Sequence, residues 1–97
     1  MHIISQKKIK DFYRKHPETE QPLKSWYSVA KKAEWKTLHE VQAIYNTASI
    51  LKQGRVVFDI CGGSYRMVTW INCKGKRIYI RFIGTHKAYD KIDAQTI

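Results

Sequence analysis

The chain has 97 residues, enough for one compact domain with a modest core but not for a second catalytic domain. Eighteen lysine and arginine residues face eight aspartate and glutamate residues, so the formal net charge is +10 with neutral histidines. This excess favours polyanionic partners, first nucleic acid and then an acidic protein or lipid headgroups. A hydrophobic fraction of 43% excludes a disordered basic tail.

Several broad classes of protein are disfavoured by simple patterns. No apolar run approaches the roughly 18 residues of a membrane span, and the first residues lack the apolar stretch of a signal peptide, so we expect a cytoplasmic protein. The two cysteines, Cys61 and Cys73, cannot form a disulfide framework. No pair of cysteines or histidines has zinc-ligand spacing, so we expect no metal and no other cofactor.

The first half of the chain has helical periodicity. Apolar residues with lysine and arginine between them predict a basic amphipathic helix over residues 5–16. Residues 17–20 break it, and Pro22 fits the first turn of a second helix. Thr37 and Glu40 have capping-box spacing, which predicts a short third helix ending near Asn46. The apolar stripe of the second helix comprises Leu23, Trp26, Tyr27 and Ala30.

After Ser49 the periodicity changes to two, which predicts strands over residues 55–61, 65–73 and 77–84 in two hairpins. Residues 1–4 are expected to add a short edge strand. Three-residue turns at 62–64 and 74–76 put Val56 opposite Trp70 and Arg66 opposite Gly84. The helix-facing side is then Val56, Phe58, Ile60, Val68, Trp70, Ile78, Ile80 and Phe82. The opposite side is Val57, Asp59, Met67, Thr69, Tyr79 and Arg81.

This sorting of apolar side chains onto one face favours that register, because a slip of one residue mixes the faces and exposes apolar area. The slipped alternative would put Val56 opposite Thr69 and Ile60 opposite Tyr65. The predicted architecture is α+β in two layers, with the N-terminal helices packed on a twisted antiparallel sheet. Residues 1–97 form a single domain.

The predicted register brings chemically active side chains to one end of the sheet. Arg66 stands near the segment Thr-His-Lys-Ala-Tyr-Asp at 85–90, and Arg81 lies on the exposed face nearby. Such a set suits RNA cleavage in which a 2′-hydroxyl attacks the adjacent phosphate. Histidine can serve as acid or base near neutral pH, tyrosine needs cationic neighbours to act as a base, and arginine supports phosphate charge.

Each feature also has a structural interpretation. Arg66 can simply pair with Asp59 or Asp90. The segment 85–90 can be only a capped turn that opens a short helix. The basic side chains of the first helix can be a solvated face, and the three tryptophans are expected in the core rather than as stacking surfaces for bases. We expect structural or surface positions for His2, His16 and His39.

The opening residues 1–7, the glycine-rich turn before Arg66 and the closing Thr-His-Lys-x-Tyr-Asp segment together resemble the HigB family of type II toxin–antitoxin toxins. That family is a branch of the RelE/ParE superfamily. The resemblance extends over essentially the whole chain. It implies an mRNA interferase that cleaves messages being translated on the ribosome. It also implies neutralisation by a HigA-like helix-turn-helix antitoxin, with which the toxin represses its own operon.

The resemblance also implies a set of site residues. Arg66 and Arg81 would stabilise phosphate charge, Arg81 being added because of its exposed-face position. His86 and Tyr89 would transfer protons, and which of them is the base stays open. The candidate RNA-binding residues are Lys74, Lys76, Lys87 and Asp90, with Asp90 orienting a neighbour.

Two alternative functions stay open at the sequence level. One is a non-catalytic nucleic-acid-binding module that uses the same arginines on phosphates. The other is a ParE-like inhibitor of DNA gyrase, because one fold can carry different activities.

Overall fold

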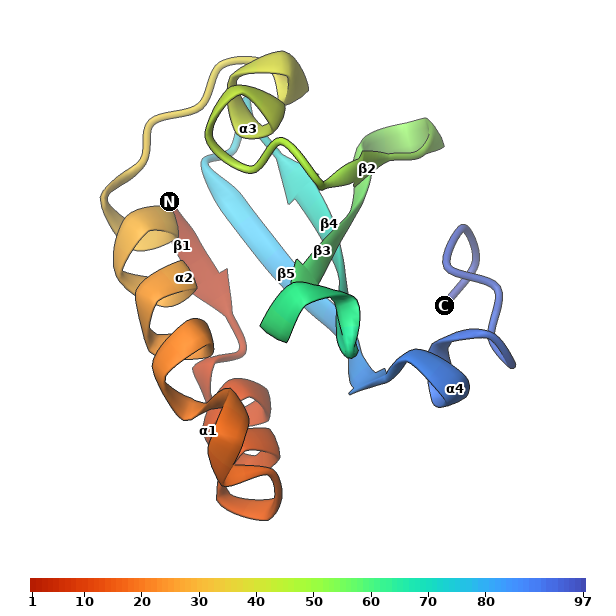
Figure 1. Ribbon diagram of the computed structural model, residues 1–97. Helices are drawn as coiled ribbons and strands as arrows, with labels where there is room; N and C mark the ends of the chain where they lie inside the picture. Colours follow the sequence, from red (N-terminus) through yellow and green to blue (C-terminus); the bar gives the residue numbers. More distant parts are fainter.

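The computed structural model describes all 97 residues as a five-stranded sheet with helices on one face (Figure 1). The strand order is β1-β5-β4-β3-β2. The strands are β1 (His2–Ile4), β2 (Ser49–Ile50), β3 (Arg55–Ile60), β4 (Tyr65–Asn72) and β5 (Arg77–Thr85). The helices are α1 (Gln6–Lys15), α2 (Glu20–Lys32), α3 (Leu38–Ile44) and α4 (His86–Tyr89).

The predicted α+β class is confirmed. The N-terminal edge strand is confirmed as well, although β1 pairs with β5 in parallel, so the sheet is mixed. β2, a two-residue edge strand antiparallel to β3, was not predicted.

The three predicted helices are present and pack on the sheet through their apolar stripes. Ile9 of α1 and Leu23, Trp26 and Ala30 of α2 are buried. A 3₁₀ turn (Pro17–Thr19) separates these helices where proline was expected to interrupt the pattern. The Glu40 carboxylate accepts a hydrogen bond from the main-chain N–H of Thr37 at 2.8 Å, as expected of a capping box. No helix combines the length and the apolarity needed to cross a membrane.

The predicted register of the first hairpin is wrong by one residue. Ile60 pairs with Tyr65 and Val56 with Thr69, which is the slipped alternative. Four residues, not three, connect β3 and β4, and three of them have positive φ angles: Cys61, Gly62 and Gly63. The sequence prediction underestimated the turn because two adjacent glycines make this longer left-handed path accessible.

As a result, β4 presents the opposite set of side chains to the helices. Met67, Thr69 and Ile71 are buried on the helix side of β4, whereas Val68 lies on the other face. Val56, Phe58, Ile60, Ile78 and Ile80 were assigned to the helix face correctly. The residues assigned to the wrong face are Val68, Trp70, Phe82, Met67 and Thr69.

The slipped register exposes little apolar area because the second face of the sheet is also covered. Figure 1 shows the C-terminal segment after α4 on the side of the sheet away from α1 and α2. Val57, Val68 and Ala94 are buried there as a second, smaller core. Sorting apolar side chains onto one face therefore does not fix the register here, because the second side of the sheet does not meet water.

The second hairpin has the predicted register over half its length. Arg66 pairs with Gly84 as predicted, and Val68 pairs with Phe82, but Thr69 then pairs with Ile80. Arg81 is therefore the extra residue of a β-bulge, which redirects its side chain. The turn that follows β4 also has four residues, since Asn72 pairs with Arg77. Both cysteines are free, as expected.

Candidate functional site

Arg66 is anchored through its Nε atom. It pairs with Asp59 directly across the β3–β4 ladder, and Arg66 Nε lies 3.1 Å from Asp59 Oδ1. The same Nε–H donates to the main-chain oxygen of Gly63 at 3.3 Å. The two side chains are 23% and 26% exposed, so the pair is largely sheltered from water. The terminal nitrogens of the guanidinium have no hydrogen-bond partner in the protein and can receive an acceptor from outside.

The glycine-rich turn passes directly over this ion pair. Gly63 has a φ of +99°, a conformation that side chains rarely adopt. A Cβ at this position would lie 3.6 Å from Arg66 Nη2 and 3.8 Å from Asp59 Oδ2. The turn thus has a structural role, as the sequence indicated, and in that role it positions Arg66.

The helix α4 begins immediately after β5 and carries the closing motif. The Thr85 hydroxyl caps it by accepting from the Ala88 main-chain N–H at 3.1 Å. The main-chain N–H of His86 donates to the oxygen of Ser64 at 3.0 Å, which joins the start of α4 to the turn before Arg66. The capped-turn interpretation of 85–90 is therefore also correct, and it explains how the motif is held beside Arg66.

The short helix α4 carries both Tyr89 and His86. The Tyr89 ring lies under the Arg66 guanidinium, and the distance from Arg66 Cζ to the ring centroid is 5.5 Å. His86 is one helical turn away, and its Nδ1 lies 3.5 Å from Asp90 Oδ2. Both members of the His86–Asp90 pair are more than half exposed. The structure therefore brings Arg66 and Tyr89 into contact, and it places the His86–Asp90 pair on the same short segment as Tyr89, at the start of β4 and the end of β5. These four residues are called the cluster below.

The other predicted site residues are more dispersed. Arg81 is exposed on the bulge of β5, and its Nε–H donates to the main-chain oxygen of Ile97 at 3.3 Å. Lys87 is exposed on α4. Lys74 and Lys76 are exposed in the turn after β4, roughly 20 Å from Arg66 at about 3.3 Å per residue. These two lysines lie beyond direct reach of the cluster.

From the sequence alone, Asp59 and Asp90 were both candidate partners of Arg66. One feature of the sequence favoured Asp59. In the slipped register, Asp59 and Arg66 are opposite charges directly across two antiparallel strands, which is a favourable cross-strand pair. The predicted register placed Met67 opposite Asp59, whereas in the structure Arg66 is opposite Asp59.

A second polar cluster, not predicted from the sequence, joins the segment between α1 and α2 to the start of β4. The Tyr65 hydroxyl donates to Glu18 Oε1 at 2.6 Å, and the His16 ring packs edge-on against Tyr65. This hydrogen bond lowers the pKa of Glu18 and raises the pKa of Tyr65 relative to their ordinary values. Because Tyr65 pairs with Thr85, this cluster occupies the same end of the sheet as α4.

The cluster offers the groups that phosphodiester cleavage needs. It contains a fixed guanidinium with free donors, an imidazole with a carboxylate at one nitrogen, and a phenol next to a cation. No three histidine, cysteine, aspartate or glutamate side chains lie together in a group that could hold a metal ion.

Comparison with known proteins gives matches over most of the chain. Residues 19–92 match the HigB toxin family, described as the RelE-like toxic component of a toxin-antitoxin system. The "mRNA interferase HigB" of Escherichia coli O6:H1 is 31% identical over 94 residues, covering 95% of this chain and 91% of that protein. The "mRNA interferase toxin HigB" of Escherichia coli strain K12 is 29% identical, covering 93% and 88%.

Proposed function

Because the chain belongs to the HigB toxin family, we propose that it is an mRNA interferase that cleaves messages while the ribosome translates them. The observation that carries this proposal is the Arg66 guanidinium, held by Asp59 and Gly63, stacked on Tyr89, and with its terminal nitrogens free. A phosphate can dock there beside the exposed His86–Asp90 pair. Because bacterial messages are translated in the cytoplasm, we also propose that the protein acts in the cytoplasm.

In the proposed reaction the 2′-oxygen attacks the adjacent phosphorus and the bond to the 5′-oxygen breaks. The products are a 2′,3′-cyclic phosphate and a 5′-hydroxyl. One group must accept the proton of the 2′-hydroxyl, and another must protonate the leaving 5′-oxygen. His86 and Tyr89 are assigned to these two transfers, in an order that we leave open.

The remaining residues act on charge and orientation. Arg66, with Arg81 further along β5, stabilises the negative charge that grows on the phosphate oxygens. Asp90 at His86 Nδ1 orients the imidazole so that Nε2 faces the substrate. Lys87 attracts the RNA backbone, and Lys74 and Lys76 at the far turn contact ribosomal RNA.

The direct test is RNA cleavage by purified ribosomes programmed with a defined message. Arg66→Ala, His86→Ala and Tyr89→Phe are each expected to reduce the cleavage rate, by about 10²–10⁴-fold for a proton-transfer group. The matched controls are Arg14→Ala on α1, His39→Ala on α3 and Tyr27→Phe on α2, none of which belongs to the cluster.

The outcomes separate the three functions considered. Parental cleavage rates in all three site variants would refute the assignment of the site. Binding of RNA without any cleavage would indicate the non-catalytic module. Inhibition of DNA supercoiling by gyrase, with the message left intact, would indicate the ParE-like activity.

We further infer that a HigA-like helix-turn-helix antitoxin neutralises this chain. A surface with a net charge of +10 favours an acidic segment in that partner, placed near Arg66 or Arg81 or arranged to block access to the ribosome. The affinity of the complex should therefore fall as ionic strength rises, measured by calorimetry between low and physiological salt. A salt-independent affinity would contradict an electrostatic interface.

A further inference from the structure

A second group of aromatic and cationic side chains lies on the same sheet face as Arg66, away from α4. Trp70 of β4 pairs with Tyr79 of β5 on one side and with Arg55 of β3 on the other. Along β4, Arg66 and Trp70 share a face, and they are separated by roughly 13 Å at about 3.3 Å per residue. A shallow pocket of about 340 Å³ is lined by Gln53, Arg55, Trp70 and Arg81.

The Trp70 indole is fixed in place without being buried. It stacks on the Tyr79 ring with 4.9 Å between centroids and 28° between planes. The main chain of Gly54 lies against its edge, and a Cβ there would be 3.0 Å from Trp70 Nε1. Gly54 also has a φ of +83°, so this close approach depends on glycine. A partly exposed and pre-oriented indole is a surface on which a nucleobase can stack.

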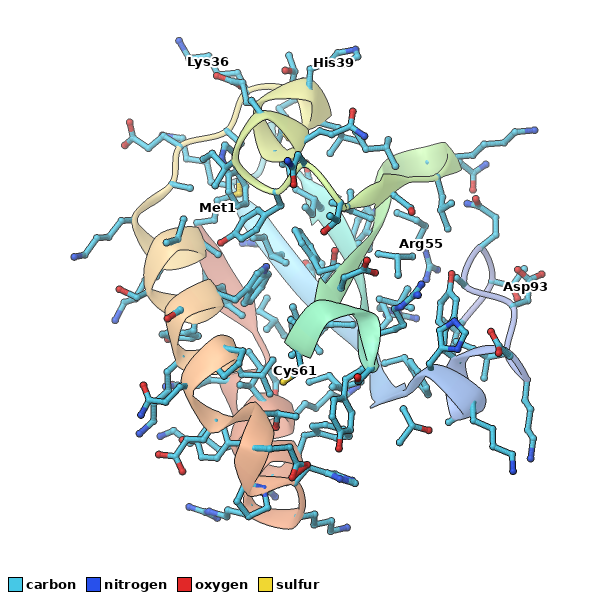
Figure 2. The ribbon with its side chains drawn as sticks, in the orientation of Figure 1. Met1, Lys36, His39, Arg55, Cys61 and Asp93 are labelled. Carbon is cyan, nitrogen blue, oxygen red and sulfur yellow. The ribbon has the colours of Figure 1, made fainter.

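Two arginines at the pocket share one acceptor. Arg55 Nη1 and Arg81 Nε both donate to the main-chain oxygen of Ile97. Figure 2 shows Arg55 reaching from the sheet toward the C-terminal segment that carries Asp93. Neither arginine forms a salt bridge with an aspartate or glutamate side chain. The two guanidiniums thus converge on a single oxygen atom, as they would on a phosphate oxygen.

We propose that Trp70, Tyr79, Arg55 and Arg81 form a nucleotide subsite for the RNA strand, next to the cleavage site. A base stacks on Trp70, and its phosphate replaces the Ile97 oxygen at Arg55. Arg81 lies between the levels of Arg66 and Trp70 along the sheet, so it reaches this phosphate from one side and the phosphate held at Arg66 from the other. The inference rests on the proposed function, because it assigns this pocket to a nucleotide flanking the one held at Arg66. Stacking accepts every base, so this subsite contributes affinity and strand position rather than sequence preference.

The first test is binding of an eight-nucleotide RNA of mixed sequence that is fully 2′-O-methylated and so cannot be cleaved. Trp70→Leu should weaken its binding to the full chain about 5- to 150-fold, and Trp70→Phe, which keeps a ring, should restore part of it. Thermal unfolding of each variant checks that the fold persists. Parental affinity in a folded Trp70→Leu variant overturns the proposal.

A second variant tests the phosphate contact without touching the aromatic pair. Arg55→Gln should reduce the slope of log affinity against log salt by about 0.7, the value for one phosphate contact on a single strand. Lys32→Gln on α2 removes the same charge from the helix side and should leave both the affinity and the cleavage rate unchanged. Equal slopes for Arg55→Gln and the parent overturn the phosphate contact.

Cleavage by programmed ribosomes separates this inference from the proposed function. If the parent cleaves and Trp70→Leu binds and cleaves equally well, the subsite is refuted and the function stands. If Trp70→Leu and Arg55→Gln lose oligonucleotide binding but the parent never cleaves, the subsite stands and the function fails. If a deca-glutamate peptide binds through Arg55 and the oligonucleotide does not, the pocket takes an acidic protein, and the proposal is overturned.

Discussion

Arg66 shows how one residue combines a structural and a chemical role. Its Nε–H is used by Asp59 and Gly63, whereas the nitrogens at the far end of the guanidinium stay free. The planar guanidinium has five donors, so an ion pair through one edge leaves others for a phosphate. The structural ion pair and the proposed phosphate contact are therefore compatible, and the first prepares the second.

The Tyr65–Glu18 hydrogen bond permits a test at the scale of one residue. Tyr65→Phe should raise the pKa of Glu18 toward its ordinary value, because the hydrogen bond from Tyr65 is the largest cause of its depression. NMR titration of the glutamate side-chain carboxyl carbons measures this shift. Tyr27→Phe, which removes a hydroxyl from α2, serves as the control and should leave Glu18 unchanged.

The same pair predicts a pH window for stability. The pKa of Glu18 is lower in the folded state than in the unfolded state. Its contribution to the free energy of unfolding is therefore present above the unfolded-state pKa and is lost as the pH falls through the folded-state pKa. The pKa of Tyr65 is higher in the folded state than in the unfolded state. Its contribution to the free energy of unfolding is therefore present below the unfolded-state pKa and is lost as the pH rises through the folded-state pKa. The measurement is the free energy of unfolding in urea, for the parent and for Tyr65→Phe, over a range of pH. A difference between the two proteins that stays constant into strong acid would contradict this account.

At the scale of elements, the length of the turn between β3 and β4 determines which side chains the helices cover. One added turn residue reverses the faces of β4 relative to β3, because side chains alternate along a strand. The bulge at Arg81 then restores the predicted pairing of Arg66 with Gly84. The sequence placed Arg66 beside the closing segment because this pairing was right, even though the register of the neighbouring hairpin was not.

Met67 distinguishes the two registers experimentally. It is fully buried in the structure, whereas the predicted register placed it on the solvent side. Met67→Ala should lower the free energy of unfolding by about 2–5 kcal/mol, measured by denaturant titration. Ile44→Ala, at a position that is 55% exposed, should change it by less than about 0.5 kcal/mol. Similar small effects in both variants would favour the predicted register.

At the scale of the whole molecule, the sheet has a core on each face. The larger core lies under α1, α2 and α3, and the smaller one lies between the sheet and the C-terminal segment. Tyr89 packs against this smaller core, and the same segment supplies the Ile97 oxygen to Arg55 and Arg81. The covering segment thus contributes to stability and also borders both proposed RNA contacts.

Ala94 tests the contribution of this second core. It is 8% exposed against Val57 and Val68, so Ala94→Asp places a charge in an apolar contact. The expected loss in the free energy of unfolding is about 1–3 kcal/mol, with faster amide exchange in the segment after α4. Ala43→Asp on the exposed side of α3 is the matched control. An equal loss in both variants would mean that the segment is not packed as described.

The sequence by itself determined the helices, the three long strands, the α+β class and the gathering of Arg66 with the closing motif. These features follow from local periodicity, capping residues and one hairpin register, all of which act over short stretches of chain. Tertiary structure decided the register of the first hairpin, the Asp59 partner of Arg66 and the aromatic pair beside Arg55. The second and third of these follow from the first, because one register pairs Asp59 with Arg66 and Arg55 with Trp70. The C-terminal segment covers the apolar side chains that this register leaves on the second face, and a contact between distant segments leaves no periodic trace in either one.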